Sequence, residues 1–215
     1  MGVLTELLDR RFGFKRPHGR LFYRNIPEGV NYFFCLGGVA FILFLLLFAT
    51  GMLLALHYIP SEESAYRSIV VIQREIRLGG FIRSLHKWSA HLFIVAILLH
   101  TIRVFVYKAY RHPRELNWIV GSMTLVVAMA SGFTGYLLPW DGKAYWATKV
   151  GTAMAGTIPV AGQALMLLLR GGEDVSETTL IRFYALHVVY LPLFMCLLLW
   201  THFHLVKRRG VKAGL

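Results

Sequence analysis

The stretch that decides the fold lies at residues 85–107 and reads LHKWSAHLFIVAILLHTIRVFVY. It is long enough to cross about 30 Å of hydrocarbon as a helix, which takes roughly 20 predominantly apolar residues. It also carries histidines, and a polar ring inside an apolar segment is costly unless it has a partner. We therefore interpret the stretch as a membrane helix whose imidazole rings have a function.

The composition of the whole chain agrees with that interpretation. Of its 215 residues, 56% are hydrophobic and only 16% are charged, which is more apolar than a soluble core of this length requires. The formal net charge of +12 would suggest nucleic acid in a soluble protein, but in a membrane protein it indicates loops that face the anionic cytoplasmic leaflet. A soluble enzyme is excluded, and we expect membrane lipid rather than nucleic acid as a partner.

Three more apolar segments of spanning length accompany the first, and no Asp or Glu lies inside any of the four. The predicted spans are Tyr32–Tyr58, Leu85–Tyr107, Trp118–Leu138 and Phe183–Val206. We predict an all-α fold, a transmembrane four-helix bundle, with a tail at 1–31, the membrane domain at 32–206 and a second tail at 207–215. The first span is expected to direct insertion without a cleaved leader.

The orientation follows from the distribution of Lys and Arg. Both tails and the loop between the second and third spans hold thirteen of these cations, whereas the two remaining loops hold eight in more residues. Cytoplasmic loops carry the excess of positive charge. We therefore expect an integral, multi-pass protein with both termini cytoplasmic, in which the second and fourth spans run in the same direction.

The loop between the third and fourth spans is too long for a simple connector in a compact bundle. Its first part, Asp141 to Met154, mixes aromatic, basic and apolar residues. That mixture is typical of a helix that lies along the membrane interface. We predict an interfacial helical segment here; a loop that merely joins two spans is the alternative.

Four histidines are spaced so that they form two pairs. His86 and His100 are fourteen residues apart, and His187 and His202 are fifteen apart, which in a helix is about 21 Å and 22 Å along the axis and within roughly 60° of one face. Since their spans are parallel, His86 should face His187 at an outer level, and His100 should face His202 at an inner level. Facing neutral imidazoles suit the two axial positions of a haem iron.

The first and third spans carry glycines at the same two depths. Gly37 and Gly51 are fourteen residues apart, as are Gly121 and Gly135. Glycine permits close approach, so a flat ring held by the histidines could press its edges against these helices. For any one residue, ordinary glycine packing or a histidine bonded to backbone is the simpler explanation. Eight residues in one register make that explanation improbable.

The other histidines do not match this pattern. His91 and His204 are rotated by about 140° and 200° from His86 and His202, so we interpret both as non-ligands. His57 has no partner at its depth, and His18 and His112 lie outside the spans.

Cations occur near both histidine levels. Arg83 and Lys87 flank His86, while Arg103 and Arg114 follow His100. They could pair with anionic haem propionates, although anchoring at the membrane interface would explain the same positions.

At this point the sequence resembles a known family, cytochrome b of the quinol:cytochrome c oxidoreductase complexes, in its short form, cytochrome b6. The resemblance rests on residues 83–89 (RSLHKWS), 113–116 (PREL), 132–141 (GFTGYLLPWD) and 182–187 (RFYALH). It implies two b-type haems, the low-potential one held by His86 with His187 and the high-potential one by His100 with His202. It also implies quinol oxidation near Tyr136, Pro139 and Trp140, although Pro139 and Trp140 could equally be a helix stop and an interface anchor.

The two cysteines differ in what they suggest. From chemistry alone, each would be a small buried hydrophobic residue. Cytochrome b6 has a cysteine at the place that matches Cys35, where it holds a c-type haem by a single thioether bond, so the resemblance implies a third haem at Cys35. Cys196 has no such counterpart and keeps the first interpretation.

The resemblance also implies partners, because the Pro-Glu-Trp-Tyr segment of the outer quinol site is absent from this sequence. In the short form a separate chain like subunit IV supplies it, beside a Rieske iron–sulfur protein and a c-type cytochrome, in a dimeric complex. We expect the bacterial plasma membrane, with the thylakoid membrane as the alternative, and no activity for this chain alone.

Two other functions are consistent with parts of the sequence. A di-haem b anchor of another quinone-linked dehydrogenase or reductase would share the histidines, but it would not predict Cys35 or the long third loop. A haem-free membrane scaffold or transporter subunit is the second alternative, and the absence of carboxylates inside the spans counts against a transporter.

Overall fold

The computed structural model describes residues 35–209, and over this range the backbone is built from helices joined by turns and short connections. Four segments are long and apolar enough to cross a membrane: Leu36–Ala55 (α3), Gly79–Val106 (α5), Glu115–Leu137 (α6) and Glu177–Arg208. The predicted all-α fold with four spans is confirmed. The tail at 1–31, its His18 and residues 210–215 lie outside the described residues.

The fourth span is composite. It consists of α9 (Glu177–Ala185), a π-helical turn (Leu186–Tyr190) and α10 (Leu191–Arg209). The predicted start at Phe183 is therefore six residues too late, because α9 begins at Glu177 behind a Ser176 capping box. Such a cap satisfies the backbone donors that a helix start leaves open.

Two other boundaries have plain local causes. The second span begins at Gly79 instead of Leu85, directly after Leu78, whose φ of 63° is left-handed and breaks the chain direction. The third span, α6, ends at Leu137, two residues before Pro139, which lacks the N–H that a continuing helix would need.

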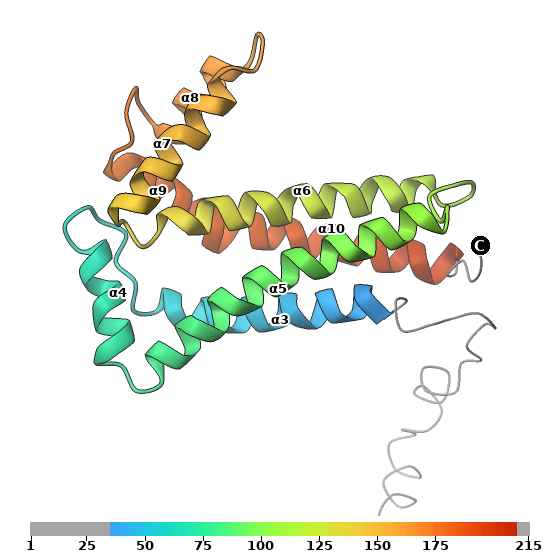
Figure 1. The fold of residues 1–215 in the computed structure, drawn as a ribbon, viewed down its shortest axis with the longest axis horizontal. Helices are drawn as coiled ribbons and strands as arrows, with labels where there is room; N and C mark the ends of the chain where they lie inside the picture. Colours follow the sequence, from blue (N-terminus) through green and yellow to red (C-terminus); the bar gives the residue numbers. More distant parts are fainter. Residues whose placement is uncertain (1–34, 210–215) are drawn as a thin grey trace, which may run out of the picture. The chain divides into compact units, whose positions relative to one another are not determined.

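The spans pack as two antiparallel pairs, α3 along α5 and α6 along α10, with a further contact between α5 and α6. Figure 1 shows α5 and α10 running in one direction and α3 and α6 in the other. The parallel course that was predicted for the second and fourth spans is confirmed. Equal steps along α5 and along the fourth span therefore lead to equal changes of depth in the bundle.

An apolar layer fills the middle of the bundle. Phe44, Phe93, Ala128 and Met195, one from each span, are all buried there, and the rings of Phe44 and Phe93 have centroids 6.2 Å apart. Each of them lies seven or eight residues from both histidines or both glycines of its own span. The layer therefore separates the two predicted levels.

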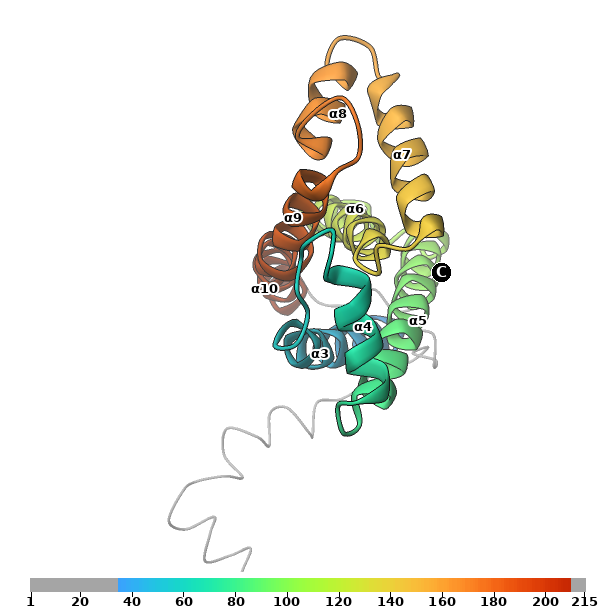
Figure 2. The ribbon, with the colours of Figure 1, turned by 90° about the vertical axis from the view of Figure 1, so that its left-hand side faces the viewer.

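Further helices gather at the end of the bundle where α5 begins, which faces the viewer in Figure 2. The predicted interfacial helix is present as α7 (Gly142–Gly156), and Asp141 caps it by accepting a 2.8 Å hydrogen bond from the Ala144 N–H. The sequence analysis did not predict α4 (Ala65–Arg74) or α8 (Gly162–Arg170). Both are short helices outside the apolar spans.

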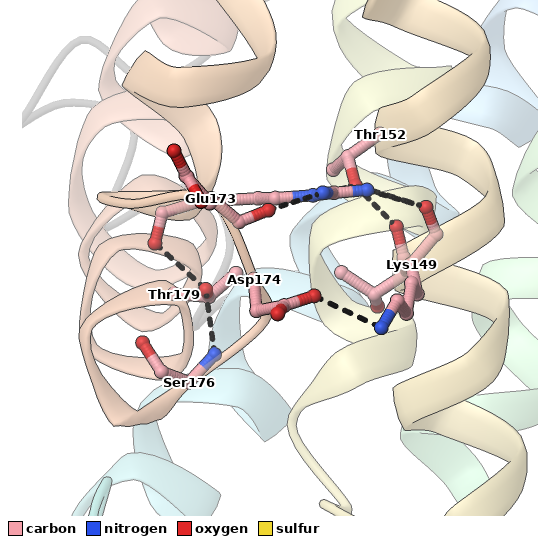
Figure 3. A network of polar contacts seen from close by, with 8 residues as sticks. Lys149, Thr152, Glu173, Asp174, Ser176 and Thr179 are labelled. Carbon is pink, nitrogen blue, oxygen red and sulfur yellow. Dashed lines mark hydrogen bonds and ion pairs between the residues drawn. The ribbon is translucent and has the colours of Figure 1, made fainter.

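Arg170, the last residue of α8, joins that helix to α7 and α9 through hydrogen bonds, and Figure 3 labels its partners Thr152, Lys149 and Thr179. Arg170 is only 5% exposed, and its guanidinium donates to Thr152 Oγ1 at 2.7 Å, the Lys149 carbonyl at 2.8 Å and the Glu173 carbonyl at 2.6 Å. Its own carbonyl accepts from Thr179 Oγ1 at 2.7 Å. All of these acceptors are neutral, so the arginine acts through hydrogen bonds rather than through an ion pair.

An exposed ion pair lies beside this network. Lys149 Nζ and an Asp174 oxygen are 2.9 Å apart, and their mutual hydrogen bond raises the pKa of Lys149 and lowers the pKa of Asp174. Solvent screens such exposed pairs strongly. The buried Arg170 should therefore hold the segment together, and the ion pair should contribute little.

Arg170→Met is expected to loosen the α7–α9 segment, because it leaves three acceptors without their donor. A cost of about 3 kcal/mol would raise local opening roughly 100-fold, which limited proteolysis of the purified protein would measure as faster cleavage between residues 142 and 180. Lys149→Ala is the control, since it removes the exposed pair but keeps the backbone carbonyl. Equal protease resistance in Arg170→Met and the unaltered protein would contradict the assignment of this role to Arg170.

Candidate metal centres between the helices

The structure brings His86 of α5 and His187 of the π turn opposite each other, at the level that the predicted orientation makes the outer one. Their ring centroids are 6.3 Å apart with an interplanar angle of 77°. At the inner level, His100 of α5 and His202 of α10 have centroids 6.4 Å apart at 78°. The two levels thus repeat nearly the same geometry.

Neighbouring groups set the proton positions of the outer pair. Thr50 Oγ1 donates to the Leu46 carbonyl at 2.7 Å, so it accepts from His86 Nδ1, which lies 2.8 Å away. His187 Nδ1 donates to the Ser131 carbonyl at 2.9 Å. In a neutral imidazole with its proton on Nδ1, the lone pair is on Nε2. Both outer rings therefore keep Nε2 available to bind a metal.

The contacts of Thr50, Ser131 and Thr134 with these rings were not predicted. Thr134 Oγ1 lies 3.4 Å from His187 Nδ1, and it occupies the place on α6 that Thr50 occupies on α3. The signal in the sequence was a Thr-Gly pair that recurs at the outer level of both helices, at residues 50–51 and 134–135. Such outer-shell groups orient ligand rings and raise their basicity.

The inner rings are less completely satisfied. Within residues 35–209, Nδ1 of His100 and Nδ1 of His202 are buried without a hydrogen-bond partner. Buried polar atoms in this state are costly, so these rings are expected to gain contacts when the site is complete.

The spacing of each pair suits one metal held from both sides. An imidazole nitrogen binds a metal at about 2 Å, which places the centroids of two opposing rings about 6 Å apart. No cluster of three or more His, Cys, Asp or Glu side chains occurs in the described part of the chain. Two opposing imidazoles are the donor set that suits the axial positions of a haem iron.

The four glycines lie directly against the histidine rings. The atom nearest to an added Cβ would be Cε1 of His100 at Gly37 (3.1 Å), of His86 at Gly51 (3.2 Å), of His202 at Gly121 (3.3 Å) and of His187 at Gly135 (2.5 Å). From the sequence, these glycines are expected to face the edges of a flat ring. The structure shows that they make room for the imidazoles themselves, one glycine to each histidine.

A cavity of about 260 Å³ adjoins the inner pair, lined by both rings and by Gly37, Gly121 and Asn117. Arg103 and Arg114 also line it, and the Arg103 guanidinium lies 5.2 Å from the centroid of the Tyr107 ring. The two inner cations are therefore close enough to meet an anionic group that projects from this cavity.

The outer cations are placed differently. Arg83 donates to Gln73 of α4 at 2.5 Å, and Lys87 is exposed. The structure thus does not direct either side chain toward the outer histidines, in contrast to the inner pair of arginines. The cause is tertiary, since α4 packs against α5 and supplies the glutamine.

The four described histidines outside the two pairs are exposed. His91 lies edge-on to Trp88, His204 stacks on Trp200, and His57 Nδ1 is 3.4 Å from the Leu53 carbonyl of its own helix. His112 lies 3.3 Å from Glu115 in the connection before α6. The structure brings none of these four to either level.

The remaining predicted site residues lie near the ends of the bundle. Cys35 is exposed at the start of α3, two residues before Gly37, while Tyr136 is exposed near the end of α6. Pro139 and Trp140 form the turn into α7, where Trp140 has a left-handed φ of 50° and meets Tyr145 edge-on. Cys196 is exposed on α10, so the expectation that it is buried was wrong.

Comparisons with known proteins agree in family. The family described as cytochrome b/b6/petB matches residues 22–210. Cytochrome b6 of Prochlorococcus marinus (strain MIT 9211) is 40% identical over 190 residues, covering 88% of this chain and 87% of its own. Cytochrome b6 of Synechococcus sp. (strain JA-3-3Ab) is also 40% identical, covering 88% of each chain.

A solved structure is similar over nearly the whole length. It is titled "Hyperthermophilic respiratory Complex III", and the match has a TM-score of 0.86 and 29% identity over 97% of this chain. The chain spans only 56% of the length of that relative. The likeness therefore covers the four-helix part described above.

Gly135→Ala is expected to displace the His187 ring, because the new methyl carbon would lie 2.5 Å from its Cε1. Overpacking of this kind costs about 1–3 kcal/mol and should separate the ring from the Ser131 carbonyl. A lower melting temperature and a reduced haem content of the purified protein would show it.

Gly132→Ala is the matched control for this change. It lies on the same helix, and no heavy atom beyond its chain neighbours and the nearby backbone of that helix stands within 4 Å of its added Cβ. The packing argument fails if the two variants have the same melting temperature and haem content.

Proposed function

The chain belongs to the cytochrome b/b6 family, and from this premise we propose that it is the cytochrome b subunit of a quinol:cytochrome c oxidoreductase, an integral membrane protein that carries electrons between the two sides of the membrane. The observation that carries the proposal is the pair of facing imidazoles at each of two levels, with centroids 6.3 and 6.4 Å apart. Family membership implies b-type haems, and the donor set at each level suits one of them.

The residues that would hold these haems follow from the contacts. His86 with His187 would hold the outer, low-potential haem, and His100 with His202 the inner, high-potential one. When bound, the haems supply one-electron transfer. Thr50 and the Ser131 carbonyl keep the protons of the outer rings on Nδ1, and the apolar layer around Phe93 keeps water from the space between the levels.

The two histidine levels lie about 21 Å apart along α5. The cations near the two levels differ in how directly they could contact a haem propionate. Arg103 and Arg114 line the inner cavity and would neutralise the propionates of the inner haem. Arg83 and Lys87 remain candidates for the same role outside, which would require Arg83 to release Gln73.

We further propose a c-type haem on Cys35. The exposed thiol at the start of α3 precedes Gly37, which lines the inner cavity together with Gly38. No heavy atom outside the local backbone stands within 4 Å of a Cβ added at Gly38, so there is room beside the cavity. Attachment would use one thioether bond to the Sγ atom.

The outer quinol site is proposed at the turn after α6. Tyr136, Pro139 and Trp140 lead from the bundle into α7, and the Arg170 hydrogen bonds hold α7 in place. Each quinol oxidised there would release two protons outside and give one electron to an iron–sulfur partner and one to the inward path that the four histidines would hold. Two such oxidations would supply the two electrons that reduce one quinone on the cytoplasmic side, where two protons would be taken up.

Membership of the family places the chain in a multi-subunit complex. We propose that a subunit IV-like chain supplies the Pro-Glu-Trp-Tyr segment, with a Rieske iron–sulfur protein and a c-type cytochrome as further partners in a dimer. The membrane would be the bacterial plasma membrane, with residues 1–31 and 207–215 as cytoplasmic tails around the domain at 32–206. Purification with a Rieske-type protein would separate this function from that of a di-haem dehydrogenase anchor.

His100→Ala should remove one b-type haem and spare the other, because only the inner level loses an imidazole. A redox titration of the purified complex would show one b-type transition where the unaltered protein shows two. His91→Ala, an exposed histidine on the same helix, should keep both. Loss of neither transition in His100→Ala would refute the inner ligand pair.

Cys35→Ala should abolish haem staining of this chain on a denaturing gel. A thioether bond survives denaturation, whereas imidazole ligation is lost when the helices separate. Cys196→Ala, which removes the other thiol of the chain, should leave the stain unchanged. Persistence of the stain in Cys35→Ala would mean that the haem is attached elsewhere.

A further inference from the structure

The fourth span contains a π-helical turn at Leu186–Tyr190, and His187 is its second residue. The N–H of Leu191 bonds to the carbonyl of Leu186, five residues back, where an α-helix would bond four residues back. A single π turn inside an α-helix holds one extra residue and commonly marks a functional position.

The two histidines of α5 are fourteen residues apart, whereas the two histidines of the fourth span are fifteen residues apart. In a regular α-helix each residue turns about 100°, so a fourteen-residue step ends about 40° short of full turns and a fifteen-residue step about 60° past them. If both spans were regular α-helices, the rotation from one histidine to the next would therefore differ between α5 and the fourth span by roughly 100°. The structure shows instead almost equal geometry at both levels, 6.3 Å and 77° against 6.4 Å and 78°.

The π turn accounts for the difference. It takes up the one additional residue between His187 and His202, so the fifteen-residue step of the fourth span has the rotation of a fourteen-residue step. His187 consequently faces His86 with Nδ1 on the Ser131 carbonyl and Cε1 toward Gly135. A rotation by 100° would remove the ring from both contacts.

Pro192 gives a chemical reason for the turn to form at this place. Proline has no N–H, so it cannot make the α-helical hydrogen bond to the Val188 carbonyl, and its ring would crowd that carbonyl. Kinks and π turns in membrane helices are tolerated where neighbouring groups form hydrogen bonds with the backbone N–H and C=O groups that lose their helical partners. The α-helical alternative is thus disfavoured between Val188 and Pro192.

We propose that the π turn at Leu186–Tyr190, favoured by Pro192, is a register element that aligns His187 with His86 and so positions the outer axial ligand. The proposal rests on the haem ligation proposed above. Pro192 acts as a positioning residue through the backbone, and it touches neither ring in this role.

The test removes the extra residue. Val189 lies in the π turn and is 46% exposed, so its deletion removes little packing. The same variant carries Pro192→Ala, which restores the backbone N–H that the shortened helix needs to close its α-helical hydrogen bonds. This double variant has a fourteen-residue step, and it should retain both b-type haems. The matched control deletes Val95, which is 50% exposed and lies between His86 and His100 on α5. That helix has no π turn, so the deletion should cost one of the two haems.

The measurement is the number of b haems per chain in membranes that contain the complete complex, by pyridine haemochrome spectrum and by redox titration. A double variant that loses a haem as the Val95 deletion does would overturn the proposal. So would a Val95 deletion that keeps both, because rotation would then not decide ligation.

A second variant guards against a deletion that fails to insert. One alanine added after Val189 gives a sixteen-residue step, which a single π turn cannot absorb, and it should remove one b haem; retention of both would overturn the proposal. If the unaltered chain itself lacks two b haems, the proposed function fails instead. The two failures are thereby distinguished.

Discussion

At each of two depths, two imidazole rings lie opposite each other with their centroids 6.3–6.4 Å apart, and this arrangement explains much of the bundle. It demands helices that run in the same direction, since only then do equal steps along α5 and the fourth span reach equal depths. It also demands space beside each ring, which the glycines of α3 and α6 provide by leaving no Cβ against His100, His86, His202 or His187. Where the backbone cannot otherwise satisfy the spacing, as at Leu186–Tyr190, it departs from the α-helix.

Packing between the two levels serves the same requirement. Phe44, Phe93, Ala128 and Met195 fill the centre of the bundle with apolar side chains, so an apolar layer separates the two histidine pairs. The inner pair adjoins a cavity with two arginines at its edge. Near the outer pair, Thr50 and the Ser131 carbonyl have definite partners, as is expected where an unsatisfied polar group is costly, whereas Nδ1 of both inner histidines has none among the described residues.

The segment between α6 and the fourth span depends on a different kind of interaction. It is not an apolar membrane span, and Arg170 organises it by donating to neutral acceptors on α7 and in the loop that follows α8. Hydrogen bonds to a buried guanidinium define directions as well as distances, so they orient α7 relative to the bundle. In the proposed function this orientation positions the turn at Pro139 and Trp140 where quinol would be oxidised.

Helix periodicity and charge were enough to predict the four spans, their parallel and antiparallel courses, α7, and which histidines share a depth, because each follows from rotation and rise along one helix. Contacts between segments far apart in sequence were beyond that reasoning. The tertiary structure alone decided that Arg83 bonds Gln73, that Thr50 orients His86, that Cys196 is exposed and that Arg170 joins three helices. The π turn lies between these cases: Pro192 and the fifteen-residue step are visible in the sequence, but only packing against α5 and α6 requires the ring to face one way.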